Sequence, residues 1–193
     1  MLINLIRSLY YKYYFSRKTP HELIRLRGGK VGEGVFIGKG VLIDYDYAFL
    51  LDIGEGAVIS ARSIIELHDS CIPNVSGHGK LKIGKVKIGV RAYIGVNSAL
   101  MPGIHIGDQA IVGACSLVNR DIPSREVWAG NPIRFLCTVD ELTQKRINVE
   151  SSSIGYFDWI GEIEKKELNY ELYKKNFIDQ VRRHFRDLEK RRL

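Results

Sequence analysis

The chain has 193 residues, 45% of them hydrophobic, which is enough for the core of one domain with flanking elements. Its three cysteines form neither a paired framework nor a C-x-x-C motif, so we expect reduced thiols and a cytoplasmic protein rather than a disulfide scaffold. The net charge of +7 is concentrated at the two ends, in residues 1–30 and 182–193, and the middle is slightly acidic. A slightly acidic middle argues against binding of nucleic acid by that part of the chain.

Residues 1–30 form a basic segment rich in tyrosine, and Leu2, Ile6, Leu9 and Tyr13 recur in it at helical spacing. We predict a helical segment. It is too short and too charged to span a bilayer, and no small-residue cleavage site follows it. The interpretation that we favour is a helix packed on the end of the domain or on a neighbouring subunit. The alternative is an interfacial helix at the inner face of the membrane, where its cations would meet anionic lipid.

Residues 31–135 form the predicted central domain, and between Val31 and Pro123 an aliphatic residue recurs every six positions and is usually followed by Gly. This period fits neither an amphipathic helix nor an alternating strand, and it predicts short strands joined by tight turns. One aliphatic side chain per unit would point inward, together with a small residue two positions before the next one. Three units would make a triangular coil, and stacked coils would bury a continuous core. The aliphatic residues that open the units are Val31, Ile37, Ile43, Ile53, Ile59, Ile65, Ile88, Ile94, Leu100, Ile106, Val112 and Val118.

The repeat is interrupted at residues 69–81, which read DSCIPNVSGHGKL. Insertions in a solenoid become loops on one face, often the binding face, so we expect this loop to take part in the chemistry and to reach toward a neighbouring subunit. Residues 136–193 are predicted to be a helical extension that ends in a basic stretch, with SSSIG at 151–155 as a linker.

The repeats, and above all their end, resemble the hexapeptide-repeat acyltransferases, in the branch of the galactoside, maltose and capsular-polysaccharide O-acetyltransferases. The end reads PGIHIGDQAIVGACSLVNRDIPSREVWAGNPIRFL, and its Asp-Ile-Pro and Ala-Gly-Asn-Pro pieces lie at the spacing of that branch. The resemblance implies a left-handed parallel β-helix, a homotrimer, and transfer of acetyl from acetyl-CoA to a sugar hydroxyl. No metal is expected, because His68, His78 and His105 do not have the spacing of the three converging histidines that metal-dependent β-helix enzymes need.

His68 stands just before the interruption, at the position where the O-acetyltransferases carry a histidine. An imidazole can take the proton of an attacking hydroxyl near neutral pH, so we predict His68 as the general base. His78 is the rival. Glu66 and Asp69 are the nearest carboxylates in the sequence, and either could orient the imidazole.

The other site residues follow from the resemblance. The backbone N–H of Val96, after the Ile-Gly pair that ends at Gly95, would stabilise the oxyanion. Coenzyme A would contact Gly95, Val96, Ala114, Asn119, Arg120 and Arg134, and the acceptor would contact Asn74, His78 and Asp44. The basic segment 1–30 does not match the acidic, aromatic start of the maltose and galactoside enzymes. The acceptor is therefore predicted to be a glycan of surface-polysaccharide assembly, such as a capsule, O-antigen or exopolysaccharide unit.

Three alternatives stay open. The acceptor could be a nucleotide-linked amino sugar, which would make the reaction an N-acetylation. The chain could be a trimeric scaffold without activity, although its His68 and Arg134 disfavour that reading. Cys71 lies close to His68 and is the nucleophile that a covalent route would use.

Overall fold

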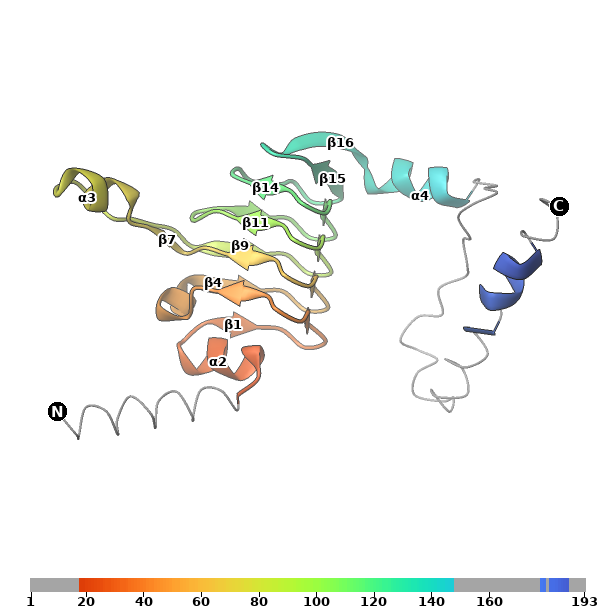
Figure 1. The fold of residues 1–193 in the computed structure, drawn as a ribbon, viewed down its shortest axis with the longest axis horizontal. Helices are drawn as coiled ribbons and strands as arrows, with labels where there is room; N and C mark the ends of the chain where they lie inside the picture. The colour runs from red at the N-terminus through yellow and green to blue at the C-terminus, as the bar shows by residue number, and fades with distance from the viewer. Residues whose placement is uncertain (1–17, 148–177, 180, 188–193) are drawn as a thin grey trace. The chain divides into compact units, whose positions relative to one another are not determined.

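The computed structural model describes residues 18–147, 178–179 and 181–187. The chain divides into two compact units, Met1–Leu142 and Thr143–Leu193. The described part of the first unit is a parallel β-helix, which confirms the predicted fold class (Figure 1). The basic aromatic helix predicted for the start of the chain, and the linker at 151–155, lie outside the described residues.

Three parallel sheets form the walls of the β-helix, and each coil contributes one short strand to each wall. Sheet A consists of β1 (Lys30–Val31), β4 (Leu51–Ile53), β9 (Val86–Ile88) and β12 (His105–Ile106). Sheet B consists of β2 (Phe36–Ile37), β5 (Val58–Ile59), β10 (Tyr93–Ile94), β13 (Ile111–Val112), β15 (Glu126–Ala129) and β16 (Arg134–Thr138). Sheet C consists of β3 (Leu42–Ile43), β6 (Ile64–Ile65), β11 (Ala99–Leu100) and β14 (Leu117–Val118).

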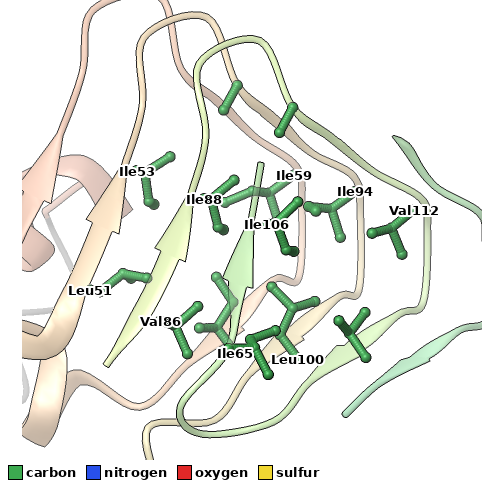
Figure 2. Packing of buried hydrophobic residues seen from close by; sticks show 14 of the residues in the cluster. Leu51, Ile53, Ile59, Ile65, Val86, Ile88, Ile94, Leu100, Ile106 and Val112 are labelled. Carbon is green, nitrogen blue, oxygen red and sulfur yellow. The ribbon is translucent and has the colours of Figure 1, made fainter. Parts of the chain in front are cut away.

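The aliphatic residues that open the hexads stack into ladders inside these walls (Figure 2). Ile65 and Leu100 are register partners on sheet C, and both are fully buried. The small residues share the interior as the repeat predicts, and the serines among them satisfy their hydroxyls internally. Ser63 donates to the carbonyl of Gly95 at 3.1 Å and Ser98 to that of Gly113 at 3.0 Å, so neither buried hydroxyl lacks a partner.

Two different constraints act at each corner of a coil. The glycine directly after an opener lies against the next coil: a Cβ on Gly38 would stand 2.5 Å from the nitrogen of Ala61. The left-handed backbone conformation falls two residues later, where Gly40 has φ 75° but Asn97 and Cys115 have φ 62° and 58°. The repeated glycine therefore serves close approach of the coils, while the left-handed position accepts other residues.

Two insertions enlarge the corner between sheets C and A. Register partners Leu100 and Val118 are 18 residues apart, which is three hexads, whereas Ile43 and Ile65 are 22 apart and Ile65 and Leu100 are 35 apart. The first excess is a 3-10 helix, η1 (Tyr45–Leu50). The second is an arm built from β7 (His68–Asp69), α3 (Cys71–Ser76) and β8 (Lys82–Ile83). In Figure 1, η1 (orange, ahead of β4) and the arm (yellow) leave the β-helix on the same side.

Short elements cover the ends of the stack. α2 (Pro20–Leu26) begins at a capping box between Thr19 and Glu22 and buries Ile24 against the first coil. At the other end β16 turns back antiparallel to β15, and α4 (Val139–Ile147) follows it. In the second unit, residues 178–179 and 181–187 are helical. No helix in the described part of the chain is long and apolar enough to cross a membrane.

Candidate active site

His68 is the first residue of the arm and lies in the corner between sheets C and A. Its Nδ1 is hydrogen-bonded to the carboxylate of Asp44, which leaves sheet C one coil earlier, directly after Ile43. The side chain of Asp44 is 12% exposed and that of His68 is 33% exposed. Because Asp44 occupies Nδ1 and no described residue bonds Nε2, the second nitrogen is the one that can exchange a proton with a substrate.

Tyr47 packs against the imidazole from η1, with the two ring centroids 4.7 Å apart and the planes tilted by 33°. Asp44 and Tyr47 together fix the position and the tilt of the His68 ring. The hydrogen bond that the Asp44 carboxylate accepts raises the pKa of His68, and the negative charges of Asp44, Glu66 and Asp69 act in the same direction. The ring is therefore a stronger base than an isolated histidine.

The orienting carboxylate is a correction to the sequence analysis. Glu66 and Asp69 were the predicted candidates, and Asp44 was assigned to the acceptor. In the structure the Asp69 carboxylate instead accepts from the backbone N–H of Cys71 at 2.8 Å, and Glu66 contributes only its charge. The reason is geometrical, because a neighbour in sequence leaves the coil in another direction while a residue one coil away lies directly beside His68.

The arm carries the remaining residues predicted near the acceptor. Asn74 donates to the hydroxyl of Ser70 at 2.9 Å within α3, and the Nδ1 of His78 is 2.7 Å from the carbonyl of Ser76. Both are exposed or partly exposed local contacts of the arm. Hydrogen bonding to Asp69 raises the pKa of the exposed Cys71 thiol, which makes that thiol a poor nucleophile.

The predicted oxyanion donor lies elsewhere, in the corner between sheets B and C. Val96 follows β10 and Gly95, and its carbonyl accepts from Cys115 on the next coil at 2.9 Å. No described group accepts a hydrogen bond from the Val96 N–H. A Cβ on Gly95 would lie 2.4 Å from the nitrogen of Ala114, so the two coils are in close contact here. This main-chain donor is rigid, as an oxyanion site requires.

The predicted coenzyme A residues divide between two corners. Ala114 lies on the next coil above Val96, in the corner between sheets B and C. Asn119 and Arg120 follow β14 and stand exposed in the corner between sheets C and A, on the same edge as His68. Arg134 opens β16 and donates to the carbonyl of Ile133 at 3.0 Å.

Within one chain, His68 and Val96 therefore lie beyond opposite ends of the strands of sheet C, in two different corners. The two residues were predicted to act in one site, and within one chain they are separated. The sequence analysis missed Tyr47, although the extra residues of the loose repeat unit IDYDYA were a signal that this corner is enlarged. Among the described residues, no three His, Cys, Asp or Glu side chains are grouped so that they could hold a metal ion.

The arrangement is a parallel β-helix of hexads with an Asp–His pair at one corner. No family model matches the chain. It is 32% identical over 116 residues to YvoF of Bacillus subtilis, an acetyltransferase by name, and the match spans 60% of this chain and 64% of YvoF. It is also 32% identical over 130 residues to WcaF of Escherichia coli, named for acetyltransfer in colanic acid biosynthesis, over 57% of this chain and 69% of WcaF. The chain belongs to the hexapeptide-repeat acetyltransferase family.

A solved galactoside acetyltransferase in complex with coenzyme A shares the fold. It aligns with a TM-score of 0.52 at 20% identity, over 81% of this chain and 87% of that one. This likeness supports the parallel β-helix architecture, including most of the described first unit.

Proposed function

We propose that this protein transfers an acetyl group from acetyl-CoA to a sugar hydroxyl in the assembly of a surface polysaccharide. The observation that carries the proposal is the Asp44–His68 pair. It leaves Nε2 open at an exposed edge beside the arm and gives the ring a raised pKa. General bases of this kind contribute about 10²- to 10⁴-fold to a rate.

The proposed reaction is direct transfer in a ternary complex. Nε2 of His68 takes the proton of the acceptor hydroxyl while the oxygen attacks the thioester carbonyl carbon. The tetrahedral intermediate carries its negative charge on the former carbonyl oxygen, and the Val96 N–H donates to that oxygen. When the carbon–sulfur bond breaks, the thiolate of coenzyme A takes the proton from His68. Asp44 stabilises the imidazolium that exists between these two proton transfers.

This mechanism needs His68 and Val96 at one site. In one chain they lie in different corners, beyond opposite ends of the strands of sheet C. We therefore infer a homotrimer in which the corner of one subunit that holds His68 faces the corner of the next subunit that holds Val96. The same division holds for the coenzyme, because Asn119 and Arg120 share the edge of His68 while Ala114 shares that of Val96. Coenzyme A would lie between two subunits.

The outward faces of the sheets support this assembly. On sheet B the outward residues include Phe36 and Tyr93, which are 58% and 44% exposed, and on sheet C they include Leu42, 62% exposed. Sheet A instead presents Lys30, Asp52, Lys87 and His105 in register. A cyclic trimer needs two different, complementary patches on each subunit, and sheets B and C provide two apolar ones.

The resemblance and the relatives support a sugar acceptor. WcaF carries a name that places it in colanic acid biosynthesis, and galactoside O-acetyltransferase of Escherichia coli is 27% identical over 169 residues. Both names refer to acetyl transfer in sugar chemistry, which favours a sugar as the acceptor.

The test is release of free thiol from acetyl-CoA in the presence of hexoses, nucleotide-linked amino sugars and purified glycan repeat units. We expect acceptor-dependent turnover with hydroxyl acceptors, reduced by about 10²- to 10⁴-fold in His68→Ala. A control, His105→Ala, removes an exposed histidine on sheet A and should keep full activity. Turnover only with amino sugars would favour the N-acetyltransferase alternative. Failure to bind coenzyme A would favour the scaffold.

A further inference from the structure

A row of aromatic rings leads from the proposed base to solvent. The centroid of the Tyr47 ring lies 4.7 Å from that of the His68 ring. The centroid of the Phe49 ring lies 6.3 Å from that of the Tyr47 ring. Tyr47 is partly buried and packs on the core, whereas Phe49 is 57% exposed. Phe49 thus contacts the ring that packs on the proposed base, in a corner that insertions enlarge, and insertions in a solenoid often form its binding face.

The row stands on a rigid base. Ala48, between the two rings, is fully buried, and a Cβ on Gly29 would lie 2.3 Å from its carbonyl oxygen. The Cβ of Phe49 lies close to Gly28, where an added Cβ would stand 3.4 Å away. η1 is therefore held directly against the segment that follows α2. The backbone of Phe49 is therefore held in place by packing while its ring is exposed to solvent.

We propose that Phe49 is a subsite for a second sugar of the acceptor: the sugar that is acetylated lies at His68, and the sugar bonded to it stacks on the Phe49 ring. The inference rests on the proposed sugar acetyltransferase function and adds that the acceptor is an oligosaccharide or a longer glycan.

The spacing fits this assignment. The two centroid distances, 4.7 and 6.3 Å, place Phe49 at most about 11 Å from the His68 ring. A sugar joined to the acetylated one can reach that far. The phenyl face carries partial negative charge and accepts the C–H groups on the apolar face of a pyranose ring.

The same 3-10 helix also carries a carboxylate suited to sugar hydroxyls. Asp46, three residues before Phe49, is 83% exposed and forms an ion pair with Arg27 at 3.5 Å. A flat apolar ring beside a few fixed polar groups is the usual composition of a carbohydrate or small-ligand site.

The experiment transfers radiolabelled acetyl from acetyl-CoA to an array of immobilised glycans with one to six sugar residues. The full chain is compared with Phe49→Leu, which keeps an apolar side chain without the ring, and with Phe49→Tyr, which keeps the ring. Phe135→Leu is the matched control, since Phe135 is 49% exposed but lies on β16. The readout is the ratio of kcat/KM for the best oligosaccharide to that for its terminal monosaccharide.

We expect a ratio above one that falls by about threefold to tenfold in Phe49→Leu and is retained in Phe49→Tyr and Phe135→Leu. Labelling that does not depend on glycan length, or a ratio unchanged in Phe49→Leu, would overturn this inference and leave the proposed function standing. If no glycan is labelled by an enzyme that binds coenzyme A, both the sugar acceptor and the Phe49 subsite fail. Thermal unfolding of each variant separates loss of fold from loss of the subsite.

Discussion

The carboxylate of Asp44 crosses from one coil of the β-helix to the next and holds Nδ1 of His68. Asp44 is much less exposed than its partner, 12% against 33%, so the hydrogen bond is shielded from water on the carboxylate side. This contact raises the pKa of His68. In the proposed reaction, it sets both the basicity of the ring and the pH at which the ring becomes available.

Replacing Asp44 by Asn should change the pH profile in a defined direction. The neutral amide can still accept from Nδ1 but no longer favours the imidazolium, so the pKa of His68 falls and the acidic limb of kcat/KM moves to lower pH. The maximal rate should fall by about tenfold, since the imidazolium in the reaction path loses its counter-charge. Glu66→Gln is the control: Glu66 acts only through its charge, so the limb should move less and kcat should stay within about twofold. An acidic limb in Asp44→Asn that matches the parent enzyme would contradict the role of Asp44.

The Asp44–His68 pair should also make the stability of the protein depend on pH. The contribution of His68 is lost as the pH rises, whereas that of a carboxylate with a lowered pKa is lost as the pH falls. A histidine whose folded pKa is raised stabilises the protein fully below its unfolded pKa of about 6.5, and this contribution disappears as the pH rises through the folded pKa. The parent should therefore lose more stability than Asp44→Asn between about pH 6 and pH 8, as measured by urea unfolding at a series of pH values. Equal slopes for the two proteins would show that the pair does not differ between the folded and unfolded states.

The hexad period was sufficient to predict the β-helix and its core. Because every unit directs one aliphatic side chain inward, residues such as Ile94 and Ile106 could be placed in the interior from the sequence alone, and both are fully buried. The role of the glycines was less predictable. Their period is visible, but only the spacing of the coils shows that Gly38 is required by contact with Ala61 rather than by its φ angle.

The partner of His68 could not be read from local spacing. Which residue lies beside His68 depends on the length of the preceding coil, and η1 lengthens that coil by an amount that a loose hexad does not reveal. Tyr47 was missed for the same reason. The resemblance pointed to His68 as the general base, and the structure shows that it lies at the start of the arm beside Asp44.

The Cys71 thiol should be dispensable. Its hydrogen bond to Asp69 raises its pKa, so little thiolate is present near neutral pH, and a covalent route through Cys71 is disfavoured. Cys71→Ser should keep kcat/KM within about twofold. Asp69→Asn should lower the pKa of the Cys71 thiol and speed its alkylation by iodoacetamide. Mass spectrometry of the labelled peptide measures the rate of alkylation. An acetylated Cys71 trapped during turnover would establish the covalent route instead.

The proposed trimer can be tested on the outward face of sheet C. Leu42→Asp places a charge on a side chain that is 62% exposed in the single chain and that we infer to be covered by a neighbouring subunit. We expect the molar mass from light scattering to fall from three chains toward one, with a loss of activity because His68 and Val96 no longer meet. Lys87→Asn, on the charged face of sheet A, should leave both mass and activity unchanged. A parent protein with the mass of one chain would refute the shared site.

One corner between sheets B and C offers a test of how the coils are held together. In Gly38→Ala the new methyl group would lie 2.5 Å from the nitrogen of Ala61 and 2.9 Å from its Cα, and this backbone cannot move without separating two coils. We expect the free energy of unfolding to fall by about 1–3 kcal/mol.

Gly40→Asn is the matched change two residues later, where φ is 75° but the nearest atom to an added Cβ is the flexible Arg62 side chain at 3.6 Å. Asn97 occupies the equivalent position with φ 62°, so Gly40→Asn should cost less than about 1 kcal/mol. Urea unfolding of the two variants measures both values. Equal losses would mean that close contact between the coils does not explain the glycine that follows each opener.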